Sequence, residues 1–326
     1  MGQAFLSMLH DHPWFEPSVL VASPGREGSR YDEQTEWLLP SPIPDVIAGR
    51  ILSSYSVSEL RKNGVRIVFS GLPSRVAEKI EPELVENGFA VFSNASAMRY
   101  REEVPIIIPE INSRECRPKG VHSLSKRGFV ITNANCTTTG LALPLAPLMV
   151  FGIRRIFVST YQALSGAGRS GFSSPELRDN VMPWISGEEE KMEKELRKIL
   201  SVDFETYPFC VRVPIPFGHL ETVWVEFRDI PSAEDITGAW ENFRFTDFDL
   251  PSLPRLPVKF MGGDSFPQPR MSFRGDPPGM EVFTGRVRRK KNLIGFVLMS
   301  NNIVRGAAGG SIANAELFLK LHGGEL

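Results

Sequence analysis

The strongest constraint on the fold is an alternation of short apolar runs with helical stretches between residues 19 and 140. The apolar runs have the length of buried strands and occupy residues 19–22, 66–70, 90–92 and 129–132. The stretches with helical spacing occupy residues 2–9, 56–63, 73–87 and 137–149. Strands that alternate with helices form a parallel sheet covered on both faces, so we predict an α/β domain with a doubly wound parallel sheet.

Beyond about residue 152 the pattern changes to longer, partly alternating runs, which predict an α+β domain with a mixed sheet. Its strands are expected at residues 154–162, 209–214, 221–227, 282–288 and 294–299. Helices are predicted at 188–200 and at 309–321, the second returning to the first domain, and the Pro- and Gly-rich residues 250–278 are predicted to be irregular. The length of 326 residues allows two domains, expected at 1–135 plus 302–326 and at 136–301.

The first predicted helix begins at the start of the sequence, whereas a doubly wound domain opens with a strand and a glycine-rich turn. By the usual lengths of a strand and a turn, about a dozen residues are expected ahead of Met1, which favours a misassigned start site. The alternative is a chain that lacks its phosphate loop.

Composition excludes several classes of protein. With 37 Lys+Arg against 38 Asp+Glu, the chain has no overall charge to attract nucleic acid or a membrane surface. No apolar run reaches the roughly 18 residues of a spanning helix, and no secretory signal is recognisable. Three cysteines argue against a disulfide framework, so a cytoplasmic location is expected. No residues have the spacing of a metal site.

The clearest chemical feature is the segment Thr-Asn-Ala-Asn-Cys-Thr-Thr-Thr-Gly at residues 132–140. It places Cys136 where a strand ends and a helix begins, and the amides of a helix N-terminus lower the pKa of a thiol. The same amides, with Asn135, suit an oxyanion formed on an attacked carbonyl. An inert buried cysteine fits this spacing equally well.

A thiol nucleophile needs an acid/base partner, and the chain has five histidines: His10, His12, His122, His219 and His322. His219 follows Arg212 and Gly218 at a predicted strand end. Arg212 is suited to bind a carboxylate with two hydrogen bonds, and Gly218 allows the backbone to approach a ligand. A histidine at an isolated strand end is more often structural than catalytic.

Two further segments are rich in glycine, at residues 162–171 and 305–311. The second precedes the last helix, where backbone amides suit a phosphate or pyrophosphate. The acidic run at residues 188–191 is by itself typical of a solvated helix face. The basic run at 286–291 lies in a predicted hairpin of a neutral chain, which disfavours a nucleic-acid site.

Residues 133–138, 162–168 and 212–219 together resemble the aspartate-semialdehyde dehydrogenase family, in its archaeal and fungal branch. Residues 93–99, 109–112 and 302–310 extend the resemblance, in the same order, over nearly the whole chain. The resemblance implies a Rossmann-type NADP-binding domain and a catalytic and dimerisation domain. It also implies a homodimer or homotetramer that uses a small-molecule substrate and inorganic phosphate.

The resemblance implies roles for individual residues. Cys136 is implied to be the nucleophile, His219 the acid/base, and Gln162 the residue that positions the acyl intermediate. The implied substrate-binding residues are Arg212 for the α-carboxylate, Glu188 for the amino group, Lys191 and Arg99 for phosphate, and the neighbouring Asn94 and Asn135. This interpretation replaces the solvated helix face at residues 188–191.

Cofactor positions follow from the same resemblance: Gly2, Ser23, Arg26, Ser70, Gly71, Ser165, Gly166 and Asn302. Arg26 is a cation near the expected 2′-phosphate, which favours NADP over NAD. The family's Gly-x-x-Gly-x-x-Gly turn is expected just before residue 3, and Gly2 alone corresponds to it.

The resemblance implies reversible, NADP-dependent reductive dephosphorylation of L-4-aspartyl phosphate to L-aspartate 4-semialdehyde, in lysine, threonine and methionine biosynthesis. Two alternatives remain open. One is a malonyl-CoA or succinyl-CoA reductase, against which Glu188 argues because such substrates lack an α-amino group. The other is a truncated, non-catalytic paralogue that pairs with a full-length partner, for which the missing glycine turn is the support.

Overall fold

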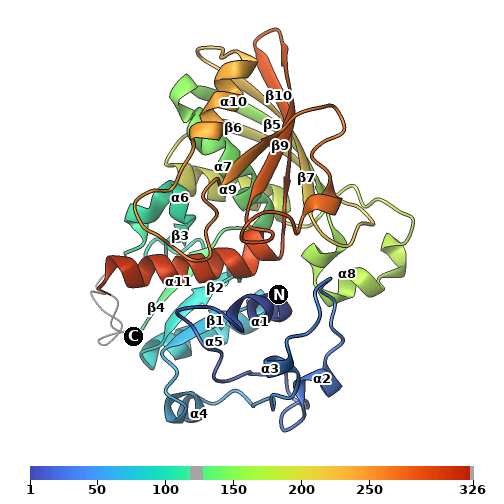
Figure 1. The fold of residues 1–326 in the computed structure, drawn as a ribbon. Helices are drawn as coiled ribbons and strands as arrows, with labels where there is room; N and C mark the ends of the chain where they lie inside the picture. The colour runs from blue at the N-terminus through green and yellow to red at the C-terminus, as the bar shows by residue number, and fades with distance from the viewer. Residues whose placement is uncertain (118–127, 324–326) are drawn as a thin grey trace.

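The computed structural model describes residues 1–117 and 128–323, which form two sheets with the last helix running between them (Figure 1). The smaller sheet has the order β1-β2-β4-β3 and is parallel throughout. Its strands are β1 (Ile67–Ser70), β2 (Ala90–Ser93), β3 (Ile106–Ile107) and β4 (Phe129–Asn133). The predicted doubly wound sheet is confirmed.

Helices cover both faces of this parallel sheet because successive strand residues point to opposite sides. On one face, Phe92 and Ile131 pack with α1 (Gly2–Leu9) and α11 (Gly309–Leu321). On the other, Val91 and Val130 pack with α4 (Val57–Lys62) and α5 (Ser74–Glu86). Helix α11 contacts β2 and β4, so the predicted return of the last helix to the first domain is confirmed.

The larger sheet is mixed and has the order β6-β5-β7-β10-β9-β8, which confirms the second predicted architecture. Neighbouring strands are antiparallel except for the two outer pairs, β5 with β6 and β8 with β9. The strands are β5 (Ile153–Gln162), β6 (Glu205–Arg212), β7 (His219–Phe227), β8 (Val258–Met261), β9 (Val282–Lys290) and β10 (Leu293–Ser300).

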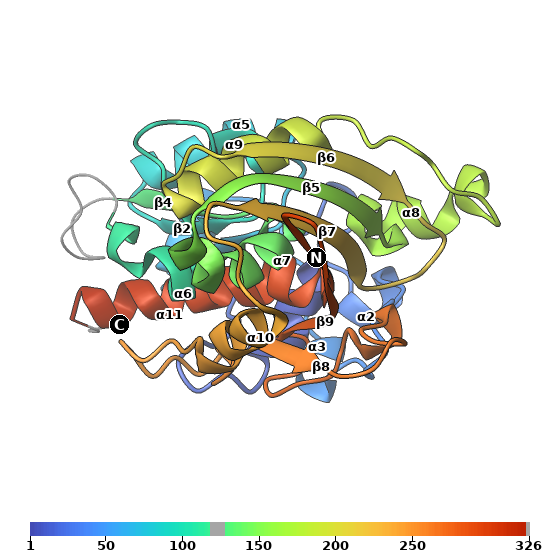
Figure 2. The same ribbon diagram turned by 90° about the horizontal axis from the view of Figure 1, so that it is seen from above.

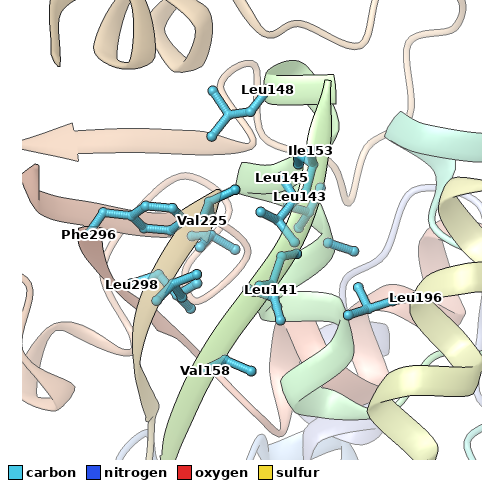
Figure 3. Close-up of a cluster of buried hydrophobic side chains, with 14 of the residues drawn as sticks. Leu141, Leu143, Leu145, Leu148, Ile153, Val158, Leu196, Val225, Phe296 and Leu298 are labelled. Atoms are coloured by element: carbon cyan, nitrogen blue, oxygen red, sulfur yellow. The ribbon is translucent and has the colours of Figure 1, made fainter. Parts of the chain in front are cut away.

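Three helices cover the inner face of the larger sheet: α7 (Cys136–Leu145), α9 (Glu188–Leu200) and α10 (Ala233–Asn242). Leu141 and Leu143 of α7 lie between Leu196 of α9 and the strand residues Val225 and Leu298, as Figure 3 shows. Helix α7 is buried along its length, so packing on both the sheet and α9 holds its N-terminus in a fixed place.

The remaining helices are short. They comprise α2 (Tyr31–Gln34), α3 (Asp45–Ala48), α6 (Pro109–Asn112) and α8 (Arg169–Ser173). Single 3₁₀ turns are η1 (Ser96–Met98), η2 (Ser113–Glu115), η3 (Ala146–Phe151), η4 (Leu164–Ala167), η5 (Pro175–Leu177) and η6 (Pro269–Met271). A π-helical segment, η7 (Val304–Ala308), leads into α11. Seen from above, the segment around α8 projects from the end of the larger sheet (Figure 2).

Several sequence-based expectations were wrong in detail. Residues 19–22 form no strand, because beyond the single bridge of Val21 to Ser53 they have no ladder partner in the described chain. Residues 250–278 are not wholly irregular, because Val258–Met261 pairs with β9 as the edge strand β8. By contrast, the helix over 137–149 was expected to be broken or short because of Pro144 and Pro147, and this is confirmed: α7 ends at Leu145 and continues as 3₁₀, since Pro147 cannot donate a helical hydrogen bond. Helix α10 and strand β3 were not predicted. The domain boundary at 135/136 stays a prediction.

Candidate active site

Cys136 is the first residue of α7, as the sequence predicts, and Asn135 caps the helix. The Oδ1 of Asn135 accepts hydrogen bonds from the Thr137 amide at 3.0 Å and the Thr137 hydroxyl at 2.7 Å. Segment η7 lies directly against the nucleophile. A Cβ atom at Gly306 would lie 2.6 Å from the Cβ of Cys136, so only glycine allows this approach.

His219 is brought to Cys136 by strand β7, with its Nε2 3.2 Å from Sγ. Its Nδ1 accepts the amide N–H of Ala163 at 3.0 Å. A nitrogen that accepts carries no proton, so the neutral ring has its proton on Nε2 and directs it at the sulfur. Burial, with the nearby charge of Arg212, lowers the pKa of His219 well below its usual value, which keeps the ring neutral.

The pKa of Cys136 differs from the sequence-based expectation. Burial raises the pKa of this thiol to about 12, and the carboxylate of Glu188 acts in the same direction. The charges of Arg212 and Arg99 and the Thr137 amide oppose that rise without overcoming it. The expected lowering by the helix N-terminus is therefore wrong for the protein without ligands, because desolvation outweighs the favourable charges.

Helix α9 places Glu188 against Asn135 with Lys191 beside it, so the solvated-face interpretation is wrong for Glu188, and the substrate roles of both residues stay a prediction. Glu188 is 8 % exposed. Its Oε1 lies 2.8 Å from Lys191 Nζ, and its Oε2 accepts from the Asn135 side-chain amide at 2.9 Å. Burial alone would raise the pKa of Glu188, but Lys191, Asn135 and Arg212 together lower it, so the group stays a carboxylate.

Arg212 and Gln162 are register partners on β6 and β5 and both are buried. The Nη1 of Arg212 donates to the Ala163 carbonyl at 2.7 Å, and Gln162 donates to Thr160 at 3.3 Å. A Cβ atom at Gly166 would lie 2.4 Å from Arg212 Nη1 and 3.3 Å from His219 Nε2. The exposed Gly166 therefore leaves open the space over these two side chains.

Arg99 and Asn94 lie near residues 133–135, which precede the nucleophile, and Asn133 donates from its side chain to Asn94 Oδ1 at 3.2 Å. Arg99 is 5 % exposed and donates from Nη1 to Glu195 at 3.0 Å and from Nη2 to the Asn94 carbonyl at 2.7 Å. The Nε of Arg99 and the side-chain nitrogen of Asn94 are buried donors without a partner among the described residues. Two buried donors in this state fit an anion such as phosphate.

The candidate cofactor residues divide into two groups. Ser165 and Asn302 form a buried pair, in which Asn302 Oδ1 also accepts from the Gly218 amide at 3.1 Å. The others lie at the carboxyl edge of the parallel sheet or near the chain start. Gly71 is exposed at the end of β1 beside Met1, and Gly2 begins α1. Ser70 instead donates to Glu81 at 2.6 Å, and Ser23 and Arg26 are exposed in a loop.

This edge fits a dinucleotide, since an exposed glycine beside a helix N-terminus suits a pyrophosphate. The segment at 305–311 does not provide such a site, and that expectation is wrong. The Gly306 and Ala308 amides already donate to the carbonyls of Asn301 and Ile303. Arg305 is 1 % exposed and paired with Glu110 at 2.7 Å, so this segment is packing rather than a phosphate loop.

Three features of the site were missed by sequence reasoning: the Ala163 amide on His219, the approach of Gly306 to Cys136, and Glu195. Glu195 follows Glu188 by seven residues, so helical spacing alone places it on the same face of α9. No sequence signal identifies the amide of Ala163.

Other candidate groups lie elsewhere. His12 pairs with Glu316 at 2.7 Å, far along the chain from Cys136, and His122 lies outside the described residues. Within residues 1–117 and 128–323, no group of His, Cys, Asp or Glu side chains is arranged to hold a metal. None of the described helices is long and apolar enough to cross a membrane.

Comparisons with known proteins agree with this geometry. The sequence model of the semialdehyde dehydrogenase NAD-binding domain matches residues 1–118, and that of the semialdehyde dehydrogenase dimerisation domain matches 144–305. An aspartate-semialdehyde dehydrogenase of Archaeoglobus fulgidus is 39 % identical, over 98 % of this chain and 95 % of its own length. The malonyl-CoA reductase (NADP) of Metallosphaera sedula is 31 % identical, over 98 % and 94 %.

Among solved structures, aspartate semialdehyde dehydrogenase with NADP from Candida albicans superimposes with a TM-score of 0.83 at 31 % identity. The match covers 98 % of this chain and 95 % of that one. The same family is indicated by the two domain models, by relatives above 30 % identity over almost the full length, and by this structural neighbour. The chain belongs to the semialdehyde dehydrogenase family.

Proposed function

We propose that this chain is an aspartate-semialdehyde dehydrogenase, which interconverts L-aspartate 4-semialdehyde and L-4-aspartyl phosphate with NADP and inorganic phosphate. The observation that carries the proposal is the contact of 3.2 Å between Cys136 Sγ and His219 Nε2 at the start of α7. Around this pair lie Arg212, a cation for a carboxylate, and Glu188, an anion for an ammonium group. The buried nitrogens of Arg99 and Asn94 that have no partner among the described residues are donors for a phosphate. That set matches the charges of the proposed substrates.

In the phosphorylating direction, Cys136 adds to the aldehyde carbon: the S–H bond breaks, the S–C bond forms, and the carbonyl oxygen takes up the proton that the sulfur releases. His219 Nε2–H lies where it can donate a hydrogen bond to that oxygen while the proton moves, and Gln162 lies on the same sheet as the register partner of Arg212. NADP, when bound, accepts the hydride of this carbon. The oxygen then loses its proton and the C=O bond returns, leaving a thioester on Cys136.

Phosphate then releases the product. One phosphate oxygen attacks the thioester carbon, the S–C bond breaks, and the leaving sulfur regains the proton that the attacking hydrogen phosphate releases. Arg99 and Lys191 are the cations assigned to hold this phosphate. Lys191 has Glu188 as its partner at 2.8 Å, so phosphate and the amino group of the substrate share one charged network.

Cofactor preference is part of the proposal. The exposed Gly71 and the start of α1 at Gly2 would receive the pyrophosphate, and Ser23 with Arg26 the 2′-phosphate ribose. Gly166 leaves room for the nicotinamide over His219, with the Ser165–Asn302 pair at its side. The NADP in the Candida albicans relative supports NADP as the cofactor.

We infer that the chain assembles as a homodimer or homotetramer through the outer face of the larger sheet. Phe209 of β6 is 69 % exposed there, and Phe157 and Tyr207 stack at 5.1 Å with much of both rings exposed. Exposed aromatic rings on one sheet face are typical of an interface. Sedimentation of the wild type, beside a Phe209→Glu variant, tests this inference by a change in mass.

The malonyl-CoA reductase among the relatives makes the substrate the point to test. Glu188 favours the amino acid, because it is a buried carboxylate beside Asn135, and a CoA thioester without an amino group brings no cation that could use this charge. The experiment measures phosphate-dependent NADP reduction with aspartate semialdehyde, beside NADPH oxidation with malonyl-CoA.

Activity with aspartate semialdehyde that is lost in Cys136→Ala supports the proposal. Glu188→Gln is then expected to lose at least about tenfold in kcat/KM, since an ammonium group loses its charged partner. Activity with malonyl-CoA alone overturns the substrate assignment. No activity with either substrate overturns the enzymatic proposal in favour of a non-catalytic paralogue.

A further inference from the structure

Helix α9 carries a series of charged side chains at helical spacing, Glu188, Lys191, Glu195 and Lys198, and two of them, Glu188 and Glu195, contact Asn135 beside the nucleophile. Glu188 and Lys191 have roles in the proposed function. Lys198 Nζ donates to three carbonyls of the Arg99 loop, those of Arg99, Arg101 and Val104, at 2.9, 3.1 and 2.7 Å. This end of α9 therefore holds the Arg99 loop against the catalytic region.

Glu195 lies on α9 between Glu188, which contacts Asn135, and Lys198, which contacts the Arg99 loop, and it is completely buried. Its Oε1 accepts from Arg99 Nη1 at 3.0 Å and from the Tyr100 hydroxyl at 3.1 Å. Its Oε2 accepts from the backbone amide of Asn135 at 2.6 Å. One carboxylate thus links the cation assigned to phosphate with the residue that precedes the nucleophile.

The arrangement fixes Arg99 in a single orientation. Nη1 is held by Glu195 and Nη2 by the Asn94 carbonyl, so the Nε, which has no partner within residues 1–117 and 128–323, has only one direction in which to donate. A planar guanidinium held at both terminal nitrogens cannot rotate about its last bonds without losing a charged hydrogen bond.

The arrangement also fixes Asn135. Its backbone amide is held by Glu195, and its side-chain amide by Glu188 at 2.9 Å. The remaining side-chain oxygen caps α7 through Thr137. The position of Cys136 at the helix start therefore depends on two carboxylates of α9.

We propose that Glu195 is a positioning residue, which holds Arg99 toward the attacking phosphate and Asn135 under the nucleophile in one fixed arrangement. The inference rests on the proposed function, because Arg99 is assigned to phosphate there. Glutamine cannot replace Glu195, because an amide has one accepting oxygen and its NH₂ group would face the other donor.

The same contact has an electrostatic consequence that needs no substrate. The charge of Arg99 lowers the pKa of Cys136, and the carboxylate of Glu195 offsets that charge. Removal of the Glu195 charge leaves Arg99 unbalanced, so the thiol of Cys136 ionises at lower pH.

The test uses the full chain as wild type, Glu195→Gln, Arg99→Lys and the double variant. Glu190→Gln is the matched control, because it removes the same charge from an exposed position on the same helix. Two quantities are measured: kcat/KM for inorganic phosphate, and the pH profile of Cys136 alkylation by iodoacetamide followed by mass spectrometry of its peptide.

Glu195→Gln is expected to lower kcat/KM for phosphate at least about tenfold, since a misplaced cation costs that much in a preorganised site. The loss should nearly vanish in the Arg99→Lys background, because residues that act through each other are not additive. The alkylation profile should move to lower pH in Glu195→Gln and stay in place in Glu190→Gln.

Additive losses in the double variant, or an unchanged kcat/KM for phosphate in Glu195→Gln, overturn the inference. If Glu195→Gln does not fold, Glu195→Asp provides the test, since it keeps the charge but is too short to reach both partners. It should lose phosphate activity with an unshifted alkylation profile. A wild type without activity overturns the proposed function alone, and the alkylation profiles then decide on Glu195: an unshifted profile in Glu195→Gln overturns its role.

Discussion

The sulfur of Cys136 lies 3.2 Å from Nε2 of His219, while Nδ1 of the same ring accepts the amide N–H of Ala163 at 3.0 Å. The contact with Ala163 determines which atom is the donor in the contact with Cys136. Because the backbone amide occupies Nδ1, the neutral ring donates from Nε2 rather than accepting there. His219 is therefore set to donate a hydrogen bond to an oxygen or to a thiolate formed at Cys136.

The tautomer of His219 can be observed directly. In ¹⁵N-histidine-labelled protein, the ring of His219 should show the pattern of an Nε2-protonated neutral imidazole. Its signals should not move between pH 8 and pH 6, because burial and Arg212 hold the pKa of His219 well below its usual value. The spectrum of His219→Gln identifies the signals. An Nδ1-protonated ring, or a titration near the usual pKa of histidine, would contradict the arrangement.

A methyl group at Gly166 should damage substrate binding more than stability. Its Cβ would lie 2.4 Å from Arg212 Nη1, so the guanidinium must leave its place at the Ala163 carbonyl. Gly166→Ala should lower kcat/KM for the substrate by about tenfold or more through a higher KM, since a displaced charged hydrogen bond is worth that much. The Tm should change little, because Gly166 is exposed.

The control for this variant is Gly238→Ala in α10, where no atom lies within 4 Å of the new Cβ. It should leave kinetics unchanged and add about 0.5–1 kcal/mol to the free energy of unfolding, because alanine is the better helix former. Steady-state kinetics and thermal denaturation of both variants check the prediction. Equal kinetics in Gly166→Ala and wild type would show that Arg212 moves without loss.

Gly306→Ala should instead affect stability and catalysis together. The new Cβ would lie 2.6 Å from the Cβ and 2.8 Å from the Cα of Cys136, where the helix start cannot yield as a side chain can. We expect a loss of about 1–3 kcal/mol in the free energy of unfolding, the usual cost of overpacking. The rate of Cys136 acylation should fall about 100-fold, because the nucleophile is displaced. Urea denaturation and a single-turnover assay measure the two effects.

The sequence was most informative where local pattern and chemistry coincide. Helices Gly2–Leu9, Glu188–Leu200 and Gly309–Leu321 have the predicted ends, because their apolar spacing and flanking residues are unambiguous. Cys136 was placed at a helix start from its strand-turn-helix context. The contact with His219 was not visible from spacing, since 83 residues separate the two and the topology of β7 brings them together.

The failures have physical causes. Strand β8 is four residues long and depends on β9 as a partner, so no period distinguishes it from a loop. The pKa of Cys136 was misjudged because burial is a property of the assembled site, and it outweighs the amides of α7 that the sequence does indicate. The pattern of the acidic run at 188–191 predicts a solvated helix face, and only the packing of α9 against Asn135 explains why Glu188 is buried.

Glu221 offers a test of the buried interior behind the site. It lies on β7, two residues after His219, is completely buried, and neither carboxylate oxygen has a hydrogen-bond partner within the described chain. Burial raises the pKa of Glu221 well above its usual value, so the folded protein holds it as a neutral acid. Its stabilising contribution is complete below the unfolded pKa and is lost as the pH rises through the folded one.

Glu221→Gln removes this dependence, because the amide is neutral at every pH. The Tm of the variant relative to wild type should therefore rise steadily between pH 5 and pH 8. Thermal denaturation in matched buffers measures the difference, and Glu190→Gln at an exposed position should give a flat line. A Tm difference for Glu221→Gln that is also flat would mean that Glu221 has the same pKa in the folded and unfolded chain.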